Sequence, residues 1–320
     1  MRQVSLVLAL VALLVFLVVG DAPERTRFWE ALFDFGHAPL SGAVALLLRG
    51  LVIGRDRAAH RASPGSASLQ AFVAAVALVV AVEALQVFQP TRSPSWVDVG
   101  RNVAGAASFL LLAEAFAARR GGGALRPGVA ARAAATVAAI ALLAAAAAGL
   151  VRTAALYAAR DRAFPTLFAL DGSWWEQELI STGRSRLTPA GANPGAGGPA
   201  AGLARLDLRP GLHPGLEFDE PYPDWRGYRC LVLTIVSDLD APLEMTIRVH
   251  DAAHDQRYHD RFNRKLTVRP GANRVVIPIA DIGRAPDRRE MDLRRVRGII
   301  LFAFDLDSPA HVYLGPLRLE

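Results

Sequence analysis

Hydrophobic residues are concentrated in the first half of the chain, where they form long runs with few polar interruptions. Each run has about the ~20 residues that a helix needs to cross the hydrocarbon core of a bilayer. The runs cover residues 4–20, 38–54, 68–88, 102–118 and 128–151. The pattern predicts an all-α membrane bundle of about five transmembrane helices over residues 1–152.

The pattern changes to short alternating runs from residue 203 onward. Turn signals such as Pro210-Gly211 and Pro270-Gly271 separate the runs, and no helical period is present. Such spacing is typical of an all-β jelly-roll sandwich. We therefore predict this fold for residues 203–320, with a start as early as residue 170. The expected strands are 203–208, 230–236, 243–249, 265–268, 274–279, 297–304 and 311–319.

Residues 153–202 lie between the two predicted parts and are expected to be a juxtamembrane segment and a linker. The stretch 188–202 is rich in Gly, Ala and Pro, a composition typical of a flexible loop. Trp174 and Trp175 stand side by side before it. They are expected either to anchor the chain at the membrane interface or to pack in the core of a first strand.

The charge of the chain indicates topology and not nucleic-acid binding. The formal net charge is +6 and the mean hydropathy is +0.26. Residues 1–160 contain 15 Arg and 8 Asp or Glu, whereas residues 161–320 contain 21 Arg or Lys and 22 Asp or Glu. Because the basic excess lies wholly in the apolar half, no basic nucleic-acid surface is expected.

The arginines of the apolar half also predict an orientation. With the N-terminus inside, nine Arg residues lie on the cytoplasmic side, as the positive-inside rule prefers. An odd number of spans then places the β-domain outside the cytoplasm of a bacterial inner membrane. Residues 1–20 also resemble a cleavable signal peptide, and cleavage would leave this orientation unchanged.

Polar residues gather where the third and fourth apolar segments approach the outer face. They are expected to converge with a histidine that opens the second segment. The set is His37, Glu83, Gln86, Arg92, Asp98 and Asn102. Two interpretations stay open: Glu83 pairs with Arg92 or Arg101 while Asp98 caps a helix, or the cluster forms a site for a polar head group or for protons.

Residues 5–118 resemble the VanZ-like family of bacterial membrane proteins. The resemblance rests on Phe35-Gly36-His37 and on nine spaced positions of one motif. These positions are Glu83, Gln86, Phe88, Pro90, Arg92, Ser95, Asp98, Asn102 and Gly105. The family is named for a protein linked to resistance against the glycopeptide teicoplanin. The resemblance implies a four-helix membrane unit and supplies no reaction.

The β-domain resembles the galactose-binding-like jelly rolls of carbohydrate-binding modules. The resemblance rests on Trp225-Arg-Gly-Tyr228, on the Pro-Gly turn before Val275-Val-Ile-Pro278 and on the final strand. In such modules aromatic faces stack on sugar rings. Tyr222, Trp225 and Tyr228 are therefore the candidate glycan-binding residues, with packing inside the sandwich as the alternative.

Three His and three Asp residues lie between His250 and Asp260, and they raise the question of a metal site. Such side chains ligate zinc or calcium, but this stretch spans a strand end and a loop, so they need not converge. The weak candidates are His250, Asp251, His254, Asp255 and His259. We expect a polar loop, shaped in part by Asp260 and Arg261, and no metal.

Cofactors are not expected, because the chain has no phosphate-binding loop, no dinucleotide-binding glycine run and no nucleophile elbow. Its single cysteine, Cys230, excludes an intrachain disulfide. We expect a cell-envelope membrane protein whose partners are lipids and an envelope glycan or a lipid-linked precursor. Two alternatives remain: an enzyme that acts on a lipid-linked head group through His37, Glu83 and Asp98, and a membrane anchor that docks a protein.

Overall fold

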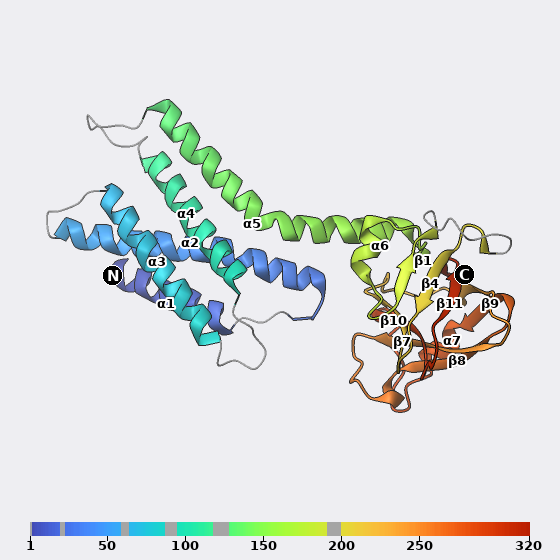
Figure 1. Cartoon of the computed structure of the whole chain (residues 1–320). Coiled ribbons are helices and arrows are strands. Elements are labelled where there is room, and N and C mark those ends of the chain that lie inside the picture. Colours follow the sequence, from blue (N-terminus) through green and yellow to red (C-terminus); the bar gives the residue numbers. More distant parts are fainter. Residues whose placement is uncertain (1, 20–22, 59–63, 87–94, 118–127, 191–199) are drawn as a thin grey trace. The chain divides into compact units, whose positions relative to one another are not determined.

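The computed structural model describes residues 2–19, 23–58, 64–86, 95–117, 128–190 and 200–320. The chain divides into two compact units, Met1–Ala154 and Ala155–Glu320. Figure 1 shows that helices make up the first unit and two β-sheets most of the second. We describe each unit by itself and call the second one the β-domain.

Helices occupy all five segments for which the hydrophobic pattern predicts them. They are α1 (Arg2–Val19), α2 (Arg27–Ala58), α3 (Pro64–Gln86), α4 (Trp96–Ala117) and α5 (Val129–Ala163). Small side chains allow α2, α3 and α4 to pack closely, with Ala45, Ala71, Ala75 and Ala106 at the centre of their contact.

Three of the described helical segments are long and apolar enough to cross a membrane. They are Arg27–Arg55, Ser66–Leu85 and Val129–Ala163. The apolar part of α1, Val4–Leu13, is shorter, and α4 is not among the three. Helices are thus present in the five segments predicted as spans, and three of the described helical segments have the length and composition of a span.

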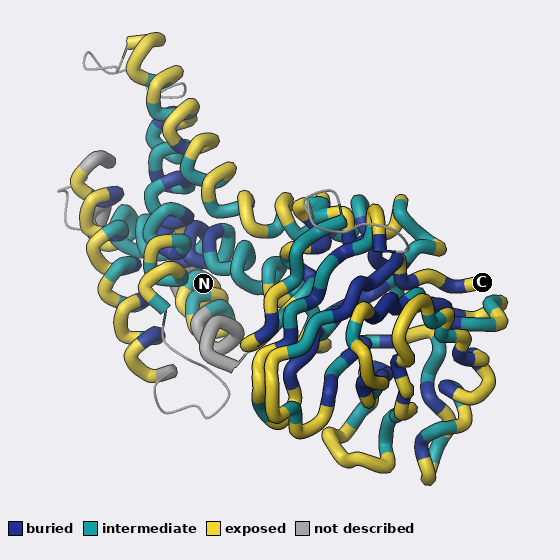
Figure 2. The backbone as a smooth tube through the Cα atoms, turned by 45° about the vertical axis from the view of Figure 1, so that its right-hand side comes forward, coloured by how far each residue is buried: buried dark blue, intermediate teal, exposed yellow. Residues whose placement is uncertain are grey.

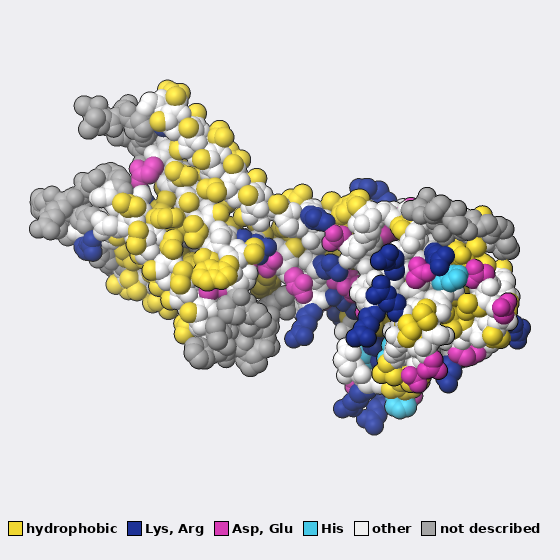
Figure 3. All heavy atoms as spheres, in the orientation of Figure 1, with side chains coloured by type: hydrophobic (Ala, Val, Ile, Leu, Met, Phe, Trp, Pro, Cys, Tyr) yellow, Lys and Arg dark blue, Asp and Glu magenta, His cyan; other side chains and the backbone are white. Residues whose placement is uncertain are grey.

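Apolar side chains cover much of the helical unit's surface (Figure 3). Leu69, Val73 and Ile140 are each about 60% exposed. An exposed apolar surface of this extent is typical of a region that contacts a membrane or another protein.

The β-domain is a sandwich of two antiparallel sheets. The seven-stranded sheet has the order β1-β12-β6-β11-β4-β3, with β9 paired to β6, and the five-stranded sheet has the order β2-β5-β10-β7-β8. Consecutive strands alternate between the two sheets from β4 to β7 and again from β8 to β11, as in a jelly roll. The strands are β1 (Thr166–Phe168), β2 (Ile180–Ser181), β3 (Arg186–Thr188), β4 (Ala204–Leu208), β5 (Gly215–Asp219), β6 (Cys230–Ser237), β7 (Leu243–Asp251), β8 (Phe262–Val268), β9 (Gly271–Pro278), β10 (Val296–Ala303), β11 (Ala310–Leu314) and β12 (Leu317–Leu319).

Alternation along the strands builds one continuous core. In β7 every second side chain from Leu243 to Asp251 is buried, and the residues between them face outward. The same alternation appears along the sheets in Figure 2. Because successive side chains point to opposite faces of a sheet, the outward residues of the five-stranded sheet are free to form a surface of different chemistry.

The sandwich begins at β1, before residue 203 and close to the earlier start near residue 170 that the sequence also allowed. The segment expected to be juxtamembrane and linker contributes β1, β2 and β3, which consist of two or three residues each. A run of two or three residues is too short to show the alternation from which a strand is predicted. β5 is longer, but it was missed because it directly follows a stretch rich in Pro and Gly.

Trp174 and Trp175 lie in a short helix, α6 (Trp174–Leu179). Trp175 is buried and stacks on Phe168, whereas Trp174 is 47% exposed.

The last turns of α5 belong to the β-domain. Leu156 is part of its core. Tyr157 donates a hydrogen bond to a carboxylate oxygen of Glu220, and Arg160 donates to the Glu220 carbonyl oxygen at 3.0 Å. Arg297, at 2.7 Å, pairs with the same carboxylate, which is 3% exposed. The helix end is therefore fixed to the sandwich by a nearly buried charge.

We predict that Gly105→Ala destabilises the helical unit. A Cβ at Gly105 in α4 would meet the backbone of Ala38 in α2, with the Ala38 Cα 2.6 Å away, so the two helices must separate. The control is Gly100→Ala in the same helix, where nothing lies within 4 Å of the added Cβ. Alanine is favoured over glycine in a helix by roughly 0.5–1 kcal/mol. In micelles, thermal unfolding followed by circular dichroism should show a lower midpoint for Gly105→Ala and an equal or higher one for Gly100→Ala. Equal midpoints for both variants would contradict the close packing.

Candidate functional site

A groove crosses the outward face of the five-stranded sheet. Its floor follows one register row, in which Ser181 lies opposite Glu217, Glu217 opposite Ile300, and Ile300 opposite Arg248. Directly paired residues place their side chains on the same face. Four strands, β2, β5, β10 and β7, thus supply a contiguous line of side chains along the groove.

Two loops and the start of β8 complete the walls. The turn between β2 and β3 supplies Thr182 and Arg184, the loop between β4 and β5 supplies Arg209 to Pro214, and Arg261 stands just before β8. The groove has a volume of about 660 Å³ and is partly open to solvent. The apolar side chains of its lining include Leu212, Ile300 and Phe302. The edge of Phe302 meets the ring of His213, with the ring centroids 5.2 Å apart.

Positive charge dominates the groove. Four arginines line it, Arg184, Arg209, Arg248 and Arg261, against one carboxylate, Glu217. Burial raises the pKa of Glu217, and the neighbouring Asp219 adds to this effect. Burial also lowers the pKa of Arg248, and the nearby charge of Arg261 lowers it further. The charge of Glu217 acts in the opposite direction on the Arg248 pKa, so the protein compensates the positive charge of the groove only in part.

Arg248 is held in the groove by a histidine. Its Nη2 donates a hydrogen bond to Nε2 of His254 at 3.0 Å. Because a guanidinium only donates, Nε2 must be the acceptor, and the ring proton resides on Nδ1. That N–H donates to the Asp260 carbonyl oxygen at 2.9 Å. His254 is therefore the neutral link between the groove and the loop behind it.

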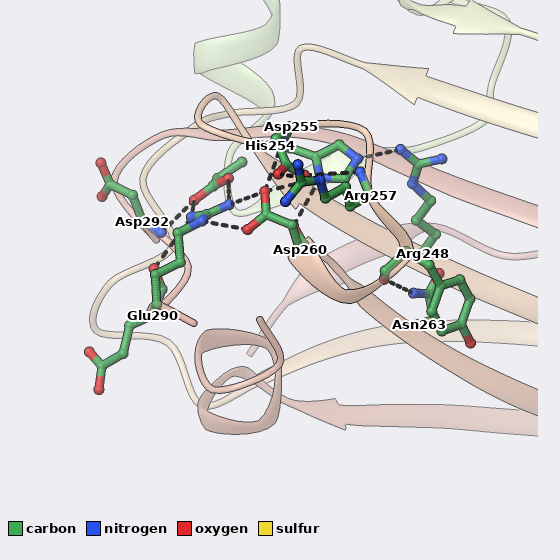
Figure 4. A network of polar contacts seen from close by, with 11 residues as sticks. Arg248, His254, Asp255, Arg257, Asp260, Asn263, Glu290 and Asp292 are labelled. Atoms are coloured by element: carbon green, nitrogen blue, oxygen red, sulfur yellow. Dashed lines mark hydrogen bonds and ion pairs between the residues drawn. The ribbon is translucent and has the colours of Figure 1, made fainter. Parts of the chain in front are cut away.

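A buried ion-pair network fixes this loop (Figure 4). Arg289 binds both oxygens of Asp251, at 2.5 and 2.8 Å, and both oxygens of Asp260, at 2.6 and 3.1 Å. The side chain of Asp251 is 0% exposed, and it also accepts the backbone N–H of Asp292 at 2.7 Å. Arg289 holds the pKa of Asp260 well below its usual range. One guanidinium thus joins the end of β7 to the loop that carries His254.

The His/Asp segment considered for a metal is thus largely used in these contacts. Ligand atoms of His254, Asp255 and Asp260 lie within 4.8 Å of one another. However, both ring nitrogens of His254 and both oxygens of Asp260 already have partners. His259 lies beside Asp287, 3.4 Å away, and is largely exposed. These contacts form a polar loop shaped by Asp260, as expected from the sequence, although Asp260 pairs with Arg289 and not with Arg261.

His250 is packed against the sheet. Its ring lies over Gly298 of β10, where an added Cβ would approach the ring Nε2 to 2.9 Å. Burial, together with the charge of Arg248, lowers the pKa of His250 to about 4. The side chain is therefore neutral at physiological pH and adds no charge next to the groove.

The aromatic residues predicted to bind a glycan lie outside this groove; Trp225 is buried, whereas Tyr222 and Tyr228 are partly buried against the core. Trp225 is 0% exposed, and its Nε1–H donates to the Tyr222 carbonyl oxygen at 2.8 Å. Tyr222 stacks on Phe164 at a centroid distance of 3.9 Å, and Tyr228 meets the same ring edge-on at 5.2 Å. Because Trp225 presents no exposed face, sandwich packing accounts for it.

Some of the polar residues predicted at the outer leaflet do meet in the helical unit. Nδ1 of His37 and Nδ2 of Asn102 are 3.2 Å apart. Asp98 pairs with Arg101 of the same helix at 2.5 Å, and Arg101 also pairs with Asp34 at 3.0 Å. Glu83 is 5% exposed and accepts the backbone N–H of Ser95 at 3.4 Å. The Gln86 side chain and Arg92 lie outside the described residues.

The described part of this cluster leaves little room for a ligand. The cavity that His37, Ser41 and Asn102 share with apolar residues of α2 and α3 has a volume of about 10 Å³. A water molecule needs roughly 10–15 Å³. A head group therefore does not fit between these side chains, and their contacts join α2 to α4.

The groove arginines and Arg289 were missed by sequence reasoning. For Arg248 a signal was present, because it occupies an outward position in the alternating run from Leu243 to Val249. No comparable signal marks Arg184, Arg209 or Arg289, which lie in loops whose placement depends on the tertiary fold.

The chain matches no family model and no curated protein. Its C-terminal part is similar to solved carbohydrate-binding modules. One is a family 11 module from Clostridium thermocellum, in complex with a β-1,3-1,4-mixed-linked tetrasaccharide. It shares 12% identity at a TM-score of 0.31, and the match covers 44% of this chain and 81% of the module. A family 30 module from the same organism shares 13% identity at a TM-score of 0.31, over 44% of this chain and 89% of that one. An exo-β-agarase shares 14% identity at a TM-score of 0.34, over 48% of this chain and 25% of that one. A likeness at this level concerns the fold at most, so the ligand must be argued from the groove itself.

We predict that Arg289→Ala strongly destabilises the β-domain. The substitution leaves the Asp251 carboxylate buried without its cation, and removing one partner of a buried ion pair costs about 3–5 kcal/mol. The neighbouring exposed residue provides the control, since Arg288→Ala should change the free energy of unfolding by less than about 0.5 kcal/mol. Urea denaturation of the full chain in micelles, followed by tryptophan fluorescence, measures both. A loss below about 1 kcal/mol for Arg289→Ala would contradict the assigned role.

Proposed function

We propose that this chain is a membrane-anchored glycan-binding protein of the bacterial cell envelope, and that its ligand lies in the groove of the β-domain. The observation that carries the proposal is the groove itself, with its floor of paired strand residues and its two loop walls. It crosses four strands and is partly open to solvent. A groove of this kind suits a segment of a longer chain.

The lining has the mixed chemistry that a sugar chain requires. Ser181, Thr182 and the arginines offer hydrogen-bonding groups for hydroxyls, while Phe302, Ile300 and Leu212 offer apolar surface for the C–H faces of sugar rings. Ligand sites commonly have volumes of about 300–1,000 Å³ and combine apolar area with a few convergent polar groups. The volume of about 660 Å³ falls within that range.

The helical unit supplies the membrane anchor in this proposal. Three helices have the length and composition of membrane spans. The arginine distribution favours a cytoplasmic N-terminus and a β-domain outside the cytoplasm, where envelope glycans are found. The VanZ-like resemblance of residues 5–118 fits such a membrane unit. Within it we propose a structural role for His37, Asp98 and Asn102, because their described contacts connect helices and enclose almost no space.

We predict that the full chain in lipid nanodiscs binds immobilised envelope oligosaccharides, and that Phe302→Ala weakens this binding about tenfold. An aromatic contact contributes about 0.5–1.5 kcal/mol beyond the area it buries, and about 1.4 kcal/mol corresponds to a factor of ten. Val276→Ala is the matched control, since Val276 is also a half-exposed apolar strand residue but lies in the other sheet. A folded chain that binds no glycan of the panel would overturn the proposal, and an equal loss in both variants would move the site away from the groove.

A further inference from the structure

We propose that the ligand of this groove is an anionic glycan, a sugar or polyol chain that carries carboxylate or phosphate groups. The inference rests on the proposed function and names the chemical class of its ligand. It is drawn from the groove's charges and donors and not from its shape.

The groove carries an excess of positive charge that its one carboxylate, Glu217, neutralises only in part. Among the described residues, none of Arg184, Arg209, Arg248 and Arg261 forms an ion pair with a carboxylate. Glu217 is the one acidic residue of the lining, and burial weakens its tendency to ionise. A neutral oligosaccharide would leave this excess uncompensated, whereas an anionic one would neutralise it.

Two of these arginines are close enough to repel each other. The charge of Arg261 disfavours the charged form of Arg248, and both guanidinium groups are partly desolvated. In addition, the Nε atoms of Arg248 and Arg261 are buried and have no hydrogen-bond partner within the described part of the chain. Holding two like charges with unsatisfied donors is costly. An anionic group bound to the outer N–H groups of both guanidiniums would offset the repulsion.

Arginine suits this task by geometry. Its planar fork of N–H donors matches the two oxygens of a carboxylate or phosphate, and such bidentate bonds are stronger than neutral ones. The contact from Arg248 to His254, and through Asp260 to Arg289, limits the freedom of the Arg248 side chain before a ligand arrives. A donor that is already positioned loses less entropy on binding.

A pair of ligands with the same sugar chain, one charged and one neutral, tests the inference. The full chain in nanodiscs of phosphatidylcholine, a lipid without net charge, is titrated calorimetrically with tetragalacturonate and with its fully methyl-esterified form. The expected result is binding of the acid about tenfold tighter than the ester, or more, since a hydrogen bond to a charged group contributes more than one to a neutral group. The difference should shrink as NaCl is raised from about 50 to 500 mM. A glycerol-phosphate tetramer is the second anionic probe, and preference for it over the uronate would assign phosphate as the charged group.

Variants then locate the effect. The double variant Arg248→Gln, Arg261→Gln should lose about tenfold in affinity for the anionic probe and change little toward the ester. Arg269→Gln, at an exposed turn outside the groove, should change neither. If the double variant does not fold, the affinities of the unaltered chain for the acid and the ester, at low and high salt, still test whether the ligand is anionic.

The outcomes separate this inference from the proposed function. Equal affinity for acid and ester, or binding of neutral glycans alone, would overturn the anionic ligand and leave glycan binding intact. Absence of binding to every saccharide and to the glycerol-phosphate tetramer would overturn both.

Discussion

The candidate site depends on one interaction, the ion pairs that Arg289 forms with Asp251 and Asp260. Asp251 ends β7 with its carboxylate inside the sandwich, where an unpaired charge would be strongly unfavourable. Arg289 compensates that charge and, with its remaining N–H groups, draws in Asp260. The Asp260 carbonyl then receives the Nδ1–H of His254, and His254 receives Arg248. The buried Asp251 carboxylate is thus linked, through Arg289, Asp260 and His254, to the Arg248 side chain in the groove, and these contacts restrict its position.

In the five-stranded sheet, side chains that stabilise the core alternate with side chains that line the groove. Inward residues of β5, β7 and β10, such as Phe218, Ile247 and Ile299, form the core of the β-domain. Their outward neighbours Glu217, Arg248 and Ile300 form the groove floor in one register row. Because the two sets alternate, the outward set can carry a poorly compensated charge without exposing the core to it. Packing of the inward residues on the opposite face offsets the unfavourable free energy of that charge.

Much of this organisation could be predicted from the sequence, and the failures have physical causes. Long apolar runs predicted the five helices, although α2 begins at Arg27, so that His37 lies inside the helix and does not open it. Seven short runs predicted strands of the sandwich, and the last of them, 311–319, is divided in the structure into β11 and β12. The strands of two or three residues lack a period and are formed by tertiary pairing, for example Thr166 with Arg318. Tyr222, Trp225 and Tyr228 were candidates because aromatic residues often contact sugars, but burial decides their role and burial is not local. The groove arginines come from four separate segments between residues 184 and 261, and only the fold brings them together.

The central claim is that a glycan occupies the groove over the five-stranded sheet, and hydrogen–deuterium exchange of the full chain with and without its saccharide tests it most directly. The account predicts slower exchange in the β2–β3 turn around residues 182–184 and in the loop at 209–215, since a bound sugar chain would cover both walls. Unchanged exchange at these walls, with protection centred on residues 222–228, would contradict it and place the ligand at the packed aromatic cluster instead.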